Sequence, residues 1–215
     1  MTYDLLLVAH IAVLGYWLGA DLCINSTFRR VATAPELGFA TRDAMFVQLM
    51  HNDQHVRYAL VLELALGTML SALLGYVPAL LFWIAPVLAV AWLALIELTH
   101  RRRNSSAGPA LARIDRVVRY AMLVLLLAAA LGLGMDAPGW LRAKLALFAL
   151  IIACGVAIRL FVIRFGKVWS ELRAQGDSDA RQAEVLAVYR GATGVLILLW
   201  ASIAAITLLA VFKPG

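Results

Sequence analysis

The sequence predicts an all-α fold, a polytopic membrane helix bundle with six transmembrane helices. Hydrophobic residues make up 63% of the 215 residues and charged residues only 15%. The apolar residues fall into runs of about twenty, which is the length that crosses roughly 30 Å of hydrocarbon as a helix. Helices are expected because lipid cannot hydrogen-bond the backbone of an open sheet.

The apolar runs place six spans in one integral membrane domain, residues 1–215. The first has no basic residues before it and no small-residue cleavage site after it, so we expect it to be retained rather than removed as a signal peptide. The expected spans cover residues 3–24, 55–76, 78–99, 116–135, 140–164 and 189–212.

The basic residues predict the orientation of the spans. The chain has 19 lysines and arginines and a formal net charge of +6, and all but Arg142, Lys144 and Lys213 fall on one side of the predicted spans. That side should face the cytoplasm of a bacterial inner membrane, with both termini in the periplasm. The basic excess then reflects topology and contact with membrane lipids, and nucleic acid is not an expected partner.

Two segments resemble each other and suggest a parallel repeat of two helical hairpins. Residues 56–67, "VRYALVLELALG", are similar to residues 118–132, "VRYAMLVLLLAAALG". The span that contains each segment is followed by a proline, Pro78 or Pro138, at the start of the next span. A duplication explains this, and so does interfacial anchoring, since arginine and tyrosine both favour the headgroup level.

Two polar segments connect the spans on the basic side. After Pro35 a helix is expected from about residue 41, running straight into the second span or breaking near Asn52. In residues 165–188 we expect an extension of the fifth helix, a turn around 176–178 and the start of the sixth helix. No second, soluble domain is expected.

The first span carries an unusual polar face. Trp17 and Asp21 each lie within roughly 20° of His10 around the helix at about 100° per residue. An ionisable group inside a membrane indicates function by default, although a neighbouring carbonyl or hydroxyl could simply satisfy the histidine. Met69 is a second soft ligand at the depth of His10, and Lys144 enters the fifth span from the same side.

The other three histidines lie near the basic side. "HNDQH" places His51 and His55 four residues apart, the spacing of a metal-ligand pair, and His100 ends the third span at the same depth. They are either metal ligands or ordinary interfacial residues. Glu63 is deeper, where a carboxyl group serves either proton transfer or helix packing.

A family resemblance bears on these residues. "HIAVLGYWLGA" (10–20) is similar to the first helix of the HemJ-type protoporphyrinogen oxidases, which are related to the CopD copper-resistance membrane domain. "GWLRAKLALFALII" (139–152) looks like a later segment of that family. The resemblance implies a helical b-type haem protein in which His10 and Lys144 are functional.

Three functions follow as hypotheses. The first is a haem b redox protein whose substrate is a quinone or a porphyrin-like compound. His10 would be the axial ligand, Trp17 would pack against the macrocycle, and Lys144 would contact a propionate or the reacting substrate. A second haem would use His55 and His100. The second is copper transport, in which His10 and Met69 admit the metal and His51, His55 and His100 receive it. The third is a structural anchor subunit, and a homo-oligomer is compatible with all three.

Overall fold

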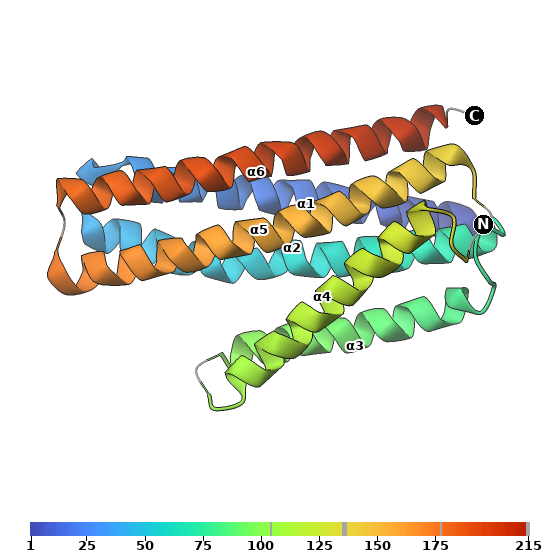
Figure 1. Cartoon of the computed structure of the whole chain (residues 1–215), viewed down its shortest axis with the longest axis horizontal. Helices are drawn as coiled ribbons and strands as arrows, with labels where there is room; N and C mark the ends of the chain where they lie inside the picture. The colour runs from blue at the N-terminus through green and yellow to red at the C-terminus, as the bar shows by residue number, and fades with distance from the viewer. Residues whose placement is uncertain (104, 135–136, 177, 214–215) are drawn as a thin grey trace. The chain divides into compact units, whose positions relative to one another are not determined.

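The structure is a computed structural model that describes residues 1–103, 105–134, 137–176 and 178–213. Within these residues it contains helices and turns but no strand (Figure 1), so the predicted all-α class is confirmed. Its elements are α1 (Thr2–Thr33), the short 3-10 helix η1 (Pro35–Leu37), α2 (Phe39–Leu73), α3 (Leu81–Arg101), α4 (Gly108–Ala130), α5 (Gly139–Gln175) and α6 (Asp179–Phe212).

Five helices of the described chain are long and apolar enough to cross a membrane, namely α1, α2, α3, α5 and α6. The helix α4 is not among them, because its first half carries Arg113, Asp115, Arg116 and Arg119. The span expected at 116–135 overlaps α4, and its last residue lies outside the described residues. A sixth membrane crossing therefore stays a prediction.

The longest helices extend beyond the expected spans. α2 has 35 residues, or about 50 Å at 1.5 Å per residue, compared with roughly 30 Å of hydrocarbon. It runs unbroken through Asn52, so the helix continues straight into the second span and does not break there. Its more polar first half precedes the mainly apolar residues 55–73. α1 likewise continues to Thr33, because no glycine or proline interrupts residues 20–34.

Two glycines and a serine mark helix boundaries on the side of the spans where lysine and arginine concentrate. Gly38, with φ of 72°, separates η1 from α2, and Gly176, with φ of 81°, ends α5 by donating its N–H to Leu172 O. The Ser178 side chain then accepts a hydrogen bond from Arg181 N and caps α6. The expected turn around 176–178 is thus confirmed, apart from residue 177, which is outside the described residues.

The chain divides into two compact units. Unit 1 comprises Met1–Ile24 and Met50–Ala121, and unit 2 comprises Asn25–Leu49 and Met122–Gly215. The helices α1, α2 and α4 therefore each contribute to both units. The two segments proposed as a repeat lie in α2 and α4, and the repeat itself stays a prediction.

Unit 2 is built on α5 and α6, which run antiparallel and side by side (Figure 1). Its hydrophobic core lies near the α5–α6 connection, where apolar side chains of both helices pack against the last turns of α1. The buried members of this core are Val31, Ala32, Phe165, Val168, Trp169, Leu172, Val185 and Val188. Close packing of this kind fixes the helix ends that carry the polar network described below.

Candidate functional site

The polar face of α1 meets a carboxyl group of α2 within unit 1. Nδ1 of His10 pairs with Oε2 of Glu63, and Glu63 is buried, with 5% of its side chain exposed. The His10 side chain keeps 19% of its surface exposed. Because Nδ1 is the ring nitrogen that lies against Glu63, Nε2 is the nitrogen left to bind a ligand.

Two neighbours shape the surroundings of His10. Gly67, one helical turn after Glu63, brings the α2 backbone so close that a Cβ at this position would lie 3.6 Å from His10 Cε1. Trp17, two turns after His10 on α1, is only 2% exposed. The imidazole therefore lies against a carboxyl group and the backbone of α2, on the same helix face as the buried Trp17.

Met69 lies on a different side of α2. Glu63 and Gly67 both face His10, whereas Met69 follows Gly67 by two residues, or about 200° around the helix. This phase places Met69 on a side of α2 other than the one that meets His10. The pairing of His10 with Met69, which the copper hypothesis needs, is accordingly not favoured by the helix geometry.

The histidines of "HNDQH" contact different helices. His55 Nδ1 lies 2.6 Å from Tyr16 Oη of α1, a hydrogen bond, whereas His51 packs edge to face against His100 of α3 with ring centroids 5.4 Å apart. Among the residues that the structure describes, no group of three or more His, Cys, Asp or Glu side chains is placed to hold a metal ion. The predicted set of His51, His55 and His100 is thus divided between two contacts.

Further polar contacts join α2, α3 and α4 in unit 1. Tyr58 donates its hydroxyl hydrogen to Glu97, which also accepts a hydrogen bond from Arg101. Asp115 of α4 accepts from Trp92 Nε1 at 3.0 Å and from Arg119 Nε at 3.0 Å. Each carboxylate is therefore held by one aromatic donor and one arginine four residues away.

Lys144, the other residue singled out by the resemblance, belongs to unit 2, in the first turns of α5. His10 belongs to unit 1. Their meeting across a cofactor or substrate stays a prediction that rests on the expected depth of both residues. Contact of Lys144 with a propionate or a substrate also stays a prediction.

Unit 2 contains a polar network that sequence reasoning did not find. Arg42 is fully buried; it donates to Val31 O at 2.8 Å and to Gln182 Oε1 at 2.9 Å, and its guanidinium lies 5.1 Å from the centre of the Trp169 ring. Gln182 donates in turn to Ala32 O at 2.8 Å. The sequence signal that could have revealed this network is the position of Arg42 among the apolar residues Phe39, Met45 and Phe46 at the start of α2.

Asp43, next to Arg42, lies before the apolar part of α2. It accepts a hydrogen bond of 2.8 Å from Trp169 Nε1 and pairs with Arg173 of α5. Burial raises the pKa of Asp43, but the hydrogen bonds from Arg173 and Trp169, together with the charge of Arg173, outweigh that effect and lower it. The carboxylate is thus stabilised in its charged form and links α2 to α5.

No family of known proteins, no curated protein and no solved structure matches this chain.

Proposed function

We propose that this chain is an integral membrane redox protein that binds haem b through His10 and transfers electrons to or from a quinone or a porphyrin-like substrate. The observation that carries the proposal is the pairing of His10 Nδ1 with the buried carboxylate of Glu63. Imidazoles that ligate metals almost always have their second ring nitrogen held in this way by a carboxylate, a backbone carbonyl or water.

The residues around His10 fit such a ligand. The Glu63 contact at Nδ1 leaves Nε2 as the proposed ligand atom, and the His10 side chain is partly exposed, which would give access. Glu63 also retains a buried oxygen, Oε1, without a hydrogen-bond partner among the described residues. A buried carboxylate beside an axial ligand makes the imidazole more electron-donating.

Haem would supply one-electron chemistry at a potential set by its axial ligands and surroundings. The chain's own residues would orient it: His10 by ligation, Trp17 by contact with the macrocycle, and Lys144 by contact with a propionate or with the substrate. The single positive charge of Lys144 suits a carboxylate partner. In this account Lys144 is the proposed catalytic residue, since it would touch the substrate.

The proposed setting is a bacterial inner membrane, with both termini in the periplasm. Five apolar helices support a membrane protein, and the concentration of lysine and arginine on one side of the spans supports this orientation. His10 would then lie nearer the periplasmic surface. Copper transport is less well supported, because helical phase places Met69 on a different side of α2 from Glu63 and Gly67, and the other histidines divide between two contacts.

The test is spectroscopic. The full chain, expressed with a haem precursor and purified in mild detergent, should show a Soret band and a reduced-minus-oxidised α band. A colourless protein that also fails to take up added haemin would overturn the proposal. Copper bound in stoichiometric amount by such a protein would favour transport, and a protein free of both would favour the anchor role.

A further inference from the structure

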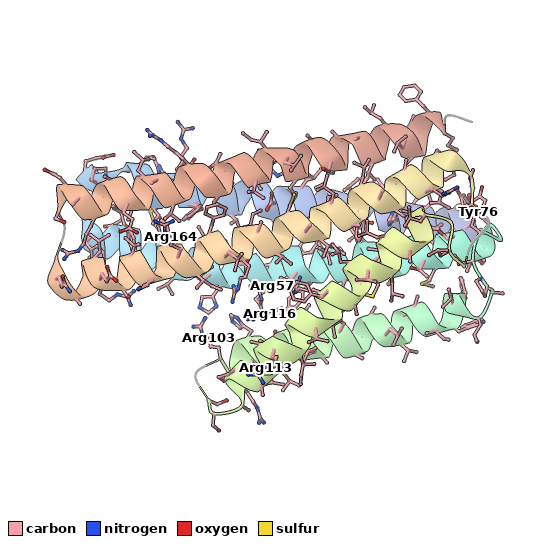
Figure 2. The ribbon with its side chains drawn as sticks, in the orientation of Figure 1. Arg57, Tyr76, Arg103, Arg113, Arg116 and Arg164 are labelled. Carbon is pink, nitrogen blue, oxygen red and sulfur yellow. The ribbon has the colours of Figure 1, made fainter. Side chains whose placement is uncertain are left out.

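Three arginines and two histidines gather at one end of unit 1. His100, at the end of α3, lies against His51 of α2, and the charges of Arg103 and Arg57 act on the His100 imidazole. Figure 2 shows Arg116 of α4 extending toward the same region as Arg57 and Arg103. These five residues, from α2, α3, the α3–α4 turn and α4, are called the cationic cluster below.

The carboxylates near the cationic cluster are already occupied. Asp53 accepts hydrogen bonds from Arg57, Glu97 is held by Tyr58 and Arg101, and Asp115 is held by Trp92 and Arg119. Among the described residues, no carboxylate ion pair is formed by the remaining arginines of this end, namely Arg102, Arg103, Arg113 and Arg116. These four arginines therefore leave an excess of positive charge at this end of unit 1.

Apolar surface adjoins this charge. Ile114 and Val117 are exposed on α4, in sequence beside Arg113 and Arg116, and Leu98 is exposed one turn before the end of α3. Exposed aliphatic side chains next to arginines are the pattern expected where hydrocarbon meets lipid headgroups. An anion that carries its own apolar chains would match both surfaces.

We propose that the cationic cluster binds a phosphate group, such as that of an anionic phospholipid headgroup. Guanidinium groups bind phosphate oxygens through paired N–H donors, and imidazoles add single donors. Bound phosphate would bring negative charge next to His51 and His100, whose surroundings carry a positive excess. This inference does not depend on haem binding or on His10.

The test compares two double variants of the full chain in uncharged detergent. Arg103→Gln/Arg116→Gln removes two charges from the cationic cluster, and Arg29→Gln/Arg30→Gln removes two exposed charges from the last turns of α1 in unit 2. Binding is titrated calorimetrically with short-chain phosphatidylglycerol, short-chain phosphatidylcholine and inorganic pyrophosphate. Circular dichroism and the Tm report whether each variant is folded.

The wild type should bind phosphatidylglycerol more tightly than phosphatidylcholine, and the cluster variant should raise the Kd for phosphatidylglycerol by about tenfold. The α1 variant should change the Kd for phosphatidylglycerol by less than about twofold, since exposed charges outside the cluster attract anions only weakly. Pyrophosphate that displaces the lipid would identify a site open to soluble phosphates, and pyrophosphate that does not would identify the lipid as the occupant.

Two results would overturn the proposal: equal losses in the two double variants, which would mean general surface attraction, or no preference of the wild type for either net-negative probe, phosphatidylglycerol or pyrophosphate, over zwitterionic phosphatidylcholine. If the cluster variant does not fold, Arg103→Lys/Arg116→Lys replaces it. That variant keeps the charge but loses the planar donor pair, so the Kd should still rise, by about threefold. An unchanged Kd in the folded lysine variant would likewise count against the site.

Discussion

Within unit 1, Nδ1 of the partly exposed His10 of α1 lies against Oε2 of the buried Glu63 of α2. A second contact, from Tyr16 to His55, lies further along the same two helices. A step of six residues along α1, from His10 to Tyr16, thus runs opposite a step of eight residues along α2 in the other direction, from Glu63 to His55. The two contacts fix the antiparallel register that presents His10 to Glu63.

The first prediction concerns Glu63. In Glu63→Gln the side-chain shape is kept but the charge facing His10 is lost, so the imidazole becomes a weaker electron donor to a bound haem. We expect the affinity for haem to fall about tenfold and the midpoint potential to rise. Haemin titration and a redox titration of the α band measure the two effects.

Glu97→Gln is the matched control, because it removes a carboxylate of unit 1 that contacts Tyr58 and Arg101 rather than His10. Its haem affinity and potential should stay near those of the wild type. Equal effects of the two substitutions, or no effect of Glu63→Gln on either quantity, would remove Glu63 from the haem site.

The second prediction concerns helix packing in unit 2. A Cβ at Gly191 of α6 would lie 2.6 Å from Cε1 of Phe161 on α5, whereas a Cβ at Gly194 meets nothing within 4 Å. Gly191→Ala should therefore destabilise the protein by about 1–3 kcal/mol through overpacking. Gly194→Ala should be neutral or stabilise it by up to about 1 kcal/mol, because alanine is the better helix former.

Thermal unfolding of both variants in one detergent measures this difference. The close approach of α5 and α6 at Gly191 would be refuted if Gly191→Ala unfolded at the same temperature as Gly194→Ala or above it.

The third prediction is a pH dependence that arises from Asp43. Its pKa in the folded protein is lower than the ordinary carboxyl value of about 3.9. The stabilisation is therefore complete above that ordinary value and is lost as the pH falls through the lower, folded value. The wild type should lose stability in this acidic range more steeply than Asp43→Asn, in which the titrating group is absent.

The measurement is the Tm of both proteins from pH 6 downward in one detergent. Arg173→Gln offers a second check, because it removes the charged partner of Asp43 and should flatten the same part of the profile. Parallel profiles for the wild type and Asp43→Asn would show that the Asp43 contacts add no pH-dependent stability.

Much of the fold follows from local properties of the sequence. Apolar runs of about twenty residues located the helices, and Gly176 and Ser178 marked the connection between α5 and α6 correctly. The expected span ends differ from the helix ends, because helices continue into water until a glycine or proline stops them. This is why α1 reaches Thr33 and α2 begins at Phe39.

The candidate site was less predictable, because it depends on how separate helices meet. The 3.6-residue period placed His10 and Trp17 on one face, but it could not identify Glu63 as the partner without the register between α1 and α2. The same period placed His51 and His55 together, although one contacts α3 and the other contacts α1. The burial of Arg42 likewise requires a backbone carbonyl of α1 and side chains of α5 and α6.

The most direct test of the central claim is the reduced-minus-oxidised spectrum of His10→Ala beside that of His51→Ala, with both proteins folded and supplied with haem. If His10 is the axial ligand, the first variant loses the α band, while the second keeps it because His51 contacts His100 at the other end of unit 1. An intact α band in His10→Ala would contradict the account.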